Sequence, residues 1–185
     1  MSRVSIKRIL GHAVVQIAYH VPDIGLAAEQ FSAQTGAGPF FLSREIQLSH
    51  GRHRGRDCPF VHSSAYGQWG EVMVEFVQQD SGGPGPFRDL FGPNETGLHH
   101  LAIMTEDLPG SYAHFNDQGM PIVTQAWTSS GVEFAFLDAV PSLGHFIEIY
   151  EASPQLLGFY QMIRDQSVDW AGDQPLRGVA ELVNI

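Results

Sequence analysis

Four polar side chains stand inside segments that are otherwise apolar, and all four are of types that bind metal ions. They are Gln16, Glu75, His100 and Glu148. A carboxylate in such a segment either faces water or has a partner, because burying it unpaired costs too much free energy. Imidazole nitrogen, carboxylate oxygen and amide oxygen are ligands of divalent metal ions. The four residues are therefore either separate solvent-facing positions of half-buried strands or the ligands of one metal site.

An internal repeat relates the four residues in pairs. The stretch that begins at Gln16 aligns without gaps with the stretch that begins at His100, and the tripeptide around Glu75 aligns with the tripeptide around Glu148. The interval between the two positions is longer in the first copy, which fits an additional Arg-rich connection there. Four potential ligands at repeat-related positions favour one metal site over four unrelated surface residues.

The elements that must position these residues follow one order twice. Alternating apolar segments bounded by Gly, Pro or Asp indicate strands, and a helical apolar spacing that ends at glycine indicates a helix. In the first copy we expect a strand over 13–21, a helix over 24–35 and strands over 40–47, 58–65 and 72–78. In the second copy we expect a strand over 99–105, a helix over 111–118 and strands over 122–127, 132–137 and 145–150. Another helix is predicted over 154–164.

This order divides the chain into four parts. Two strand–helix–three-strand (βαβββ) modules cover residues 12–79 and 97–151. A Gly/Pro-rich linker with a short helical turn covers residues 80–96, and a C-terminal helix and tail cover residues 152–185.

Composition narrows the function classes. The 185 residues include 10 Lys and Arg against 20 Asp and Glu, a formal net charge of −10, which disfavours nucleic-acid binding. Cys58 is the single cysteine, which excludes an internal disulfide and a Cys-rich zinc site. The sequence shows neither an apolar run long enough for a membrane span nor a secretory signal, so we expect a soluble cytoplasmic protein. The basic stretch 44–56 is either a solvated loop or hairpin turn, or a contact for an anionic small ligand.

Two short segments carry a resemblance to a known family. Residues 97–103 (GLHHLAI) and 144–149 (GHFIEI), together with the tandem modules, make the chain similar to the vicinal oxygen chelate (glyoxalase/bleomycin resistance/dioxygenase) superfamily. Within it the chain most resembles methylmalonyl-CoA epimerase and glyoxalase I, over about residues 12–151. The resemblance implies an α+β fold, in which tandem βαβββ modules form a cupped, mostly antiparallel sheet, with a C-terminal helix.

The same resemblance implies a chemistry. One divalent metal ion (Co, Ni, Zn, Mn, Mg or Fe) would be held by Gln16, Glu75, His100 and Glu148. The enzyme would be an isomerase, epimerase or lyase that abstracts a proton next to a carbonyl, via a metal-chelated enolate, on a small carboxylated or CoA-linked metabolite. Glu75 and Glu148 are the candidate catalytic residues and could serve as ligand and base in turn. Gln16 stands where many epimerases have histidine, and it argues against a two-His, one-Glu dioxygenase site. A glyoxalase I-type lyase and a metal-free, drug-sequestering binding module are the alternatives.

Further side chains are expected to bind the substrate, a small molecule. They are His20, Tyr66, Trp69 and Phe134. His99 precedes the proposed ligand and is expected on the opposite face of its strand, at the surface or behind the ligand. The apolar positions from Leu156 to Ile163 are expected either to form a homodimer contact or to dock on the sheet of their own chain. Neither nucleic acid nor a membrane is expected as a partner.

Overall fold

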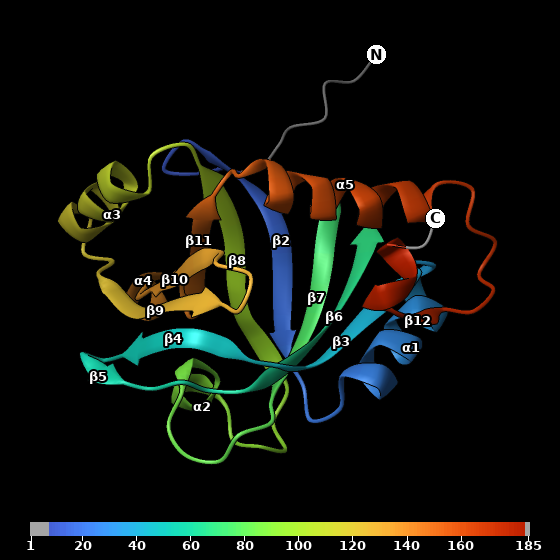
Figure 1. The fold of residues 1–185 in the computed structure, drawn as a ribbon, viewed down its shortest axis with the longest axis horizontal. Coiled ribbons are helices and arrows are strands. Elements are labelled where there is room, and N and C mark those ends of the chain that lie inside the picture. Colours follow the sequence, from blue (N-terminus) through green and yellow to red (C-terminus); the bar gives the residue numbers. More distant parts are fainter. Residues whose placement is uncertain (1–7, 184–185) are drawn as a thin grey trace.

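The computed structural model describes residues 8–183, in which two βαβββ modules follow one another along the chain (Figure 1). The first module contains β2 (His12–His20), α1 (Ile24–Thr35), β3 (Phe40–Ile46), β6 (His62–Trp69) and β7 (Val72–Gln79). The second contains β8 (Gly97–Thr105), α3 (Leu108–Asp117), β9 (Ile122–Thr128), β10 (Glu133–Leu137) and β11 (Phe146–Glu151).

The structure has further strands and helices, and the further strands extend the two modules into one continuous sheet. They are β1 (Arg8–Ile9), β4 (Leu48–His53), β5 (Arg56–Asp57), α2 (Pro86–Leu90), α4 (Val140–Leu143), α5 (Pro154–Ser167), β12 (Leu176–Gly178) and the 3-10 helix η1 (Val179–Val183). The strand order is β12-β3-β6-β7-β2-β8-β11-β10-β9-β4-β5, and β1 pairs with β2. The pairs β2–β7, β8–β11 and β3–β12 are parallel, and the others are antiparallel. The expected α+β class, with a mostly antiparallel sheet and a C-terminal helix, is confirmed.

The sheet curls so that it has an inner and an outer face. Phe40 packs in an outer cluster with Ile24 and Ala28 of α1, whereas the next residue, Phe41, packs in the inner cluster. Adjacent residues of a strand point to opposite faces, so β3 contributes one aromatic ring to each side of the sheet. α3 covers the outer face of the second module in the same way, with Phe115 fully buried. Neither α1 nor α3 covers the inner face, so the side chains of this face line the space that the curled sheet encloses.

Local signals determine α1, which has the predicted bounds. The side chain of Asp23 accepts hydrogen bonds from the backbone N–H groups of Gly25 and Leu26, as an N-cap residue does. Gly36 ends the helix in the left-handed conformation, with φ of +73°, which glycine adopts without a Cβ clash.

The arginine-rich segment is the main departure from the expected strands. The strand expected over 58–65 begins at His62 instead, and residues 48–57 form β4 and β5. β4 leaves the first module and pairs antiparallel with β9 at the far edge of the second. Its buried positions, Gly51 and His53, alternate with the exposed His50 and Arg52, so only half of the strand is covered. The residues of β4 and their sequence neighbours therefore give little indication of a strand, because the partner strand β9 lies in the other module.

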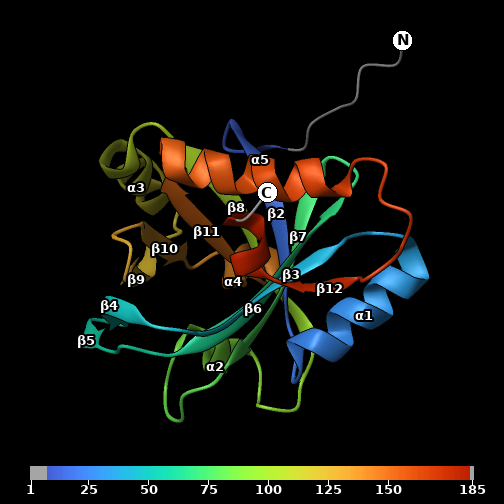
Figure 2. The same cartoon turned by 45° about the vertical axis from the view of Figure 1, so that its right-hand side comes forward.

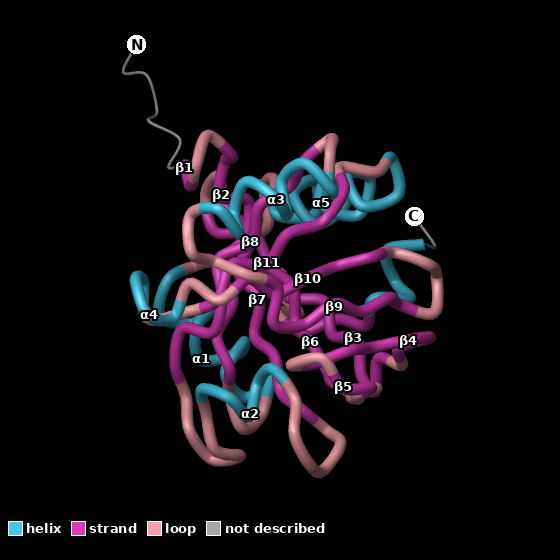
Figure 3. Tube along the Cα trace, turned by 90° about the vertical axis from the view of Figure 1, so that its left-hand side faces the viewer, coloured by secondary structure: helices cyan, strands magenta, loops and turns pink. Residues whose placement is uncertain are grey.

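Two helices lie at opposite ends of the curled strands, α5 at one and α2 at the other (Figures 2 and 3). Tyr160 and Ile163 of α5 are buried against the sheet of the same chain, which is one of the two placements expected for this helix. Phe87 of α2 is buried in the inner cluster, so the Gly/Pro-rich linker is packed against the modules. Within residues 8–183, no helix is both long and apolar enough to cross a membrane.

Candidate metal centre

The register of four neighbouring strands places the predicted ligands close together on the inner face. Across β7, β2 and β8, Glu75 lies opposite Ala18, and Ala18 lies opposite His100. One step along, Gln16 lies opposite Ala102, and Ala102 lies opposite Glu148 of β11. Each long polar side chain thus has a fully buried alanine beside it. The small alanines leave the space into which the longer side chains converge.

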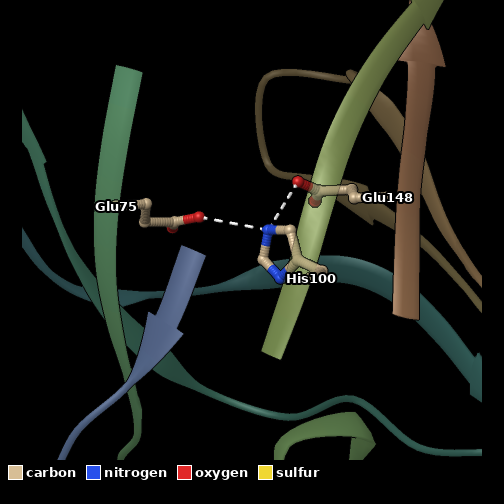
Figure 4. A group of neighbouring side chains, drawn as sticks. All are labelled: Glu75, His100 and Glu148. Atoms are coloured by element: carbon tan, nitrogen blue, oxygen red, sulfur yellow. Dashed lines mark ion pairs between the residues drawn. The ribbon is translucent and has the colours of Figure 1, made fainter. Parts of the chain in front are cut away.

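Three of the four predicted ligands meet at one point, and Figure 4 shows them pointing toward one another from three strands. His100 Nε2 lies 3.0 Å from Glu148 Oε2 and 3.4 Å from Glu75 Oε2. One donor atom from each residue lies within 4.8 Å of the others, and all three residues are buried. The solvent-facing alternative for these residues is therefore wrong.

Burial and mutual charge control the protonation of this triad. Burial raises the pKa of Glu148, against the opposing effect of His100. Burial alone would lower the pKa of His100, but the adjacent Glu148 and Glu75 carboxylates raise it to about 9. A proton on His100 therefore holds together two carboxylates that would otherwise repel each other.

The orientation of His100 fits a metal ligand. Its Nδ1 lies 2.9 Å from Nδ1 of His99, and Nε2 of His99 lies 3.1 Å from the carbonyl oxygen of Pro86. A carbonyl only accepts, so His99 donates from Nε2 and accepts from the N–H at Nδ1 of His100. Burial and the neighbouring His100 hold the pKa of His99 well below its usual range, so it stays neutral and able to accept.

This relay leaves Nε2 of His100 as the atom that faces the carboxylates. In the part of the chain that the structure describes, Nε2 has no hydrogen-bond partner despite its closeness to both carboxylates. An imidazole nitrogen and two carboxylate oxygens around one point are a donor set that divalent transition metals accept, and a second residue behind the imidazole is usual at such sites. The residues present therefore fit a divalent metal ion.

Gln16 lies on the same face, but its oxygen is engaged elsewhere. The Tyr150 and Tyr160 hydroxyls lie 2.8 and 3.1 Å from Gln16 Oε1 and 2.6 Å from each other. We call these three side chains the tyrosine–glutamine cluster. Two O–H protons serve three oxygen–oxygen contacts, so one contact is without a proton in any arrangement. Coordination of a metal by Gln16 stays a prediction.

A cavity of about 130 Å³ opens beside the triad, and the three residues of the triad form part of its lining. Its walls are mostly apolar and come from both modules and from α5; they include Ile46, Tyr66, Val132, Phe134, Phe136, Leu156 and Phe159. Two of the four residues expected to bind substrate, Tyr66 and Phe134, are therefore in its wall. A site with few polar groups in an apolar wall is typical of small-molecule binding.

The other two residues expected to contact the substrate do not line this cavity, and their role in substrate binding stays a prediction. The His20 ring stacks on Phe91, and its two nitrogens contact the Glu95 carbonyl and Arg88 at 2.8 and 3.0 Å, so it is occupied within the linker region. Trp69 is 44% exposed at the end of β6 and packs edge-on against Phe31 on the outer side. His20 keeps the same face of β2 as Gln16, because the register with β7 is unbroken from Gln16 to His20, but its ring packs against α2 and the linker.

Sequence reasoning missed three polar aromatic residues of the cavity. They are His62, Tyr150 and Tyr160. Two of them carried a usable signal, because each lies an even number of residues from a recognised inner-face position of its own strand, Tyr66 or Glu148. The third, on α5, had none, since the docking of a helix on a distant sheet leaves no local mark.

A comparison with protein-family models identifies the architecture. Residues 15–136 match the model of the glyoxalase/bleomycin resistance protein/dioxygenase superfamily. The chain belongs to this superfamily. Glu148 and the whole of α5 lie beyond the matched residues, so the fold completes the superfamily's cup with segments that the match does not cover. No curated protein matches the chain.

Solved structures share the superfamily fold at low sequence identity. A hypothetical protein from Bacillus halodurans is 17% identical, with a TM-score of 0.55, covering 78% of this chain and 96% of that one. Methylmalonyl-CoA epimerase from Mycobacterium tuberculosis is 15% identical, with a TM-score of 0.53 and coverage of 84% and 97%. A Streptomyces coelicolor methylmalonyl-CoA epimerase in complex with 2-nitronate-propionyl-CoA is 16% identical, with a TM-score of 0.51 and coverage of 81% and 97%. At these identities the likeness concerns the fold.

Proposed function

We propose that this chain is a metal-dependent isomerase, epimerase or lyase that abstracts a proton next to a carbonyl group of a small carboxylated or CoA-linked metabolite. The observation that carries the proposal is the convergence of His100 Nε2 with two buried carboxylates, at 3.0 and 3.4 Å, at the wall of a cavity. Membership of a superfamily whose solved relatives include epimerases supports it. In a purely structural role, the ion pairs of His100 with the two carboxylates would offset only part of the cost of burying three titratable groups together.

The roles of the residues follow from their positions. A divalent ion held by Glu75, His100 and Glu148 would act as a Lewis acid toward substrate oxygens. Glu148 is the better candidate for the base, because burial raises its pKa and so increases its affinity for a proton. Phe134 and Phe136, on the inner face beside it, exclude water from the proton that moves.

The experiment compares metal content and proton exchange in the same preparations. Tag-free protein is incubated in turn with Mn²⁺, Co²⁺, Ni²⁺ and Zn²⁺ and desalted, and its metal is measured by elemental analysis. Deuterium incorporation from heavy water is then followed by NMR in methylmalonyl-CoA and in 2-oxopentanoate. We expect about one ion per chain and exchange at the carbon next to the carbonyl.

Two variants and a control separate the roles. His100→Ala should lose the metal, whereas His114→Ala, which changes an exposed histidine of α3, should keep it. Glu148→Gln should retain its circular dichroism spectrum and lose exchange by roughly 100-fold or more. Full metal content in His100→Ala would reject that ligand, and unchanged exchange in Glu148→Gln would reject that base. A wild-type protein that takes up no metal would favour the metal-free binding module.

A further inference from the structure

His62 is a buried imidazole in the cavity wall whose polar atoms the triad does not use. It is 8% exposed, and its Nδ1 has no hydrogen-bond partner among the residues described. Buried polar groups are nearly always hydrogen-bonded, because an unmade bond costs the full desolvation of the group. The His62 side chain lines the cavity, so a small adjustment of the ring would bring its unpartnered nitrogen within reach of a molecule that enters the cavity.

The register places His62 at a defined end of the cavity. On β6 and β7, Tyr66 lies opposite Glu75 and His62 lies opposite Gln79. Gln16 lies opposite Met73 on the other side of β7. Along β7, Glu75 thus lies between the position opposite His62 and the position opposite Gln16. His62 lies on the side of Glu75 toward α2, and the tyrosine–glutamine cluster lies on the side toward α5. His62 is about 13 Å from Glu75 along the strand direction, before the side chains lean toward each other.

The surroundings of His62 are apolar and favour an uncharged partner. The rings of Phe60 and Phe87 lie 5.5 and 5.8 Å from its imidazole. Burial lowers the pKa of His62 to about 4, although Glu75 and Asp80 act to raise it, so the imidazole is neutral near pH 7. A carboxylate placed here would be desolvated beside two aromatic rings and an uncharged donor, whereas a carbonyl oxygen loses much less hydration.

We infer that His62, in the tautomer that carries its proton on Nδ1, is a substrate-binding residue that donates a hydrogen bond from Nδ1 to an uncharged carbonyl oxygen of the substrate, remote from the oxygens held at the triad. The inference rests on the proposed function and narrows its substrate class. The substrate then has a carboxylated or carbonyl-bearing end at the triad and a second carbonyl, of a ketone, ester or thioester, several bonds away. His62 sets specificity for that second group and takes no part in the proton transfer.

Matched pairs of probes test the second carbonyl. 2-Oxopentanoate is compared with 2,4-dioxopentanoate, and 2-oxohexanoate with 2,5-dioxohexanoate, by calorimetric titration of protein loaded with Mn²⁺. We expect at least one of the two added carbonyls to tighten binding of wild-type protein by about tenfold, as one well-placed hydrogen bond in an apolar site does. His62→Leu should abolish this preference, which is measured as the ratio of the affinities for the two acids of each pair in the same Mn²⁺-loaded protein.

A conservative variant and the simple acids keep the outcomes distinct. His62→Asn places an amide N–H near the position of Nδ1 and should recover part of the preference, which a merely structural role would not predict. If Mn²⁺ and the simple acids bind but neither added carbonyl helps, or if the preference persists in His62→Leu, the inference is overturned and the proposed function stands. If the protein takes up no Mn²⁺, both are overturned.

Discussion

The imidazole of His100 is oriented from behind, and this has a measurable consequence at the scale of single residues. Loss of the His99 nitrogen should free the His100 ring to rotate and weaken metal binding. We expect His99→Phe to bind Zn²⁺ about 10- to 100-fold more weakly in a chelator competition titration. His99→Gln, whose amide oxygen can still accept from Nδ1 of His100, should recover much of the affinity.

An unchanged affinity in His99→Phe would show that packing alone orients His100. Its ring lies 5.0 Å from that of Phe136, so the aromatic wall is the competing explanation. Far-ultraviolet circular dichroism of the two variants controls for folding.

The repeat accounts for how well single residues could be predicted from sequence. Three of the four predicted ligands converge because equivalent positions of the two modules face one cavity. The orientation of Gln16 could not be predicted, since it depends on Tyr160, which reaches the site from another element. His62 was missed because the strand expected over 58–65 ended before Tyr66, the recognised cavity residue that shares its face.

At the scale of elements, α5 is attached to the site through a hydroxyl group. Tyr160 is buried and joins α5 to the tyrosine–glutamine cluster. We expect Tyr160→Phe to lower the free energy of unfolding by about 1 kcal/mol in urea denaturation, because the change removes a hydrogen bond but little apolar surface. Metal content should not change.

A neighbouring position on the same helix provides the control. Leu157 is 49% exposed, so Leu157→Ala should change the free energy of unfolding by no more than about 0.5 kcal/mol. Equal effects of the two substitutions would mean that the buried hydroxyl of Tyr160 contributes no more to stability than an exposed side chain of the same helix.

Elements were predictable in proportion to how local their signals are. The bounds of α1 follow from Asp23 and Gly36, both within one residue of the helix. β4 was not predicted, because its partner β9 is contributed by the other module and its outward residues are polar. β12 was likewise missed, since three residues that pair with β3 carry too short a pattern to recognise.

At the scale of the whole molecule, His62 links stability to pH. Below its ordinary pKa of 6.5 the unfolded chain protonates His62, but the folded protein does not until about pH 4. The unfolded state therefore binds more protons in this interval, and stability falls as the pH falls from 6.5 toward 4. From pH 8 to pH 4 this group alone should cost about 3 kcal/mol of the free energy of unfolding of the metal-free protein.

The comparison that isolates this effect is His62→Gln, which does not titrate. Urea denaturation at pH 8 and pH 4 should show a loss that is smaller by about 3 kcal/mol in the variant. Parallel losses in both proteins would mean that acid denaturation is governed by the carboxylates instead.

The segment from β3 to β4 belongs to both ends of the sheet, and this bears on how the two repeats can be inherited. β3 pairs within its own module, whereas β4, two residues further on, pairs at the far edge of the other. The halves are thus joined by the β2–β8 ladder and also by the β4–β9 ladder. A gene encoding either half alone would produce a chain with two bare sheet edges, which are templates for aggregation. The two repeats can therefore change in sequence, but the strand pairs that join them have to be kept. A recombination event that replaced one half would also have to supply β4 or its partner β9.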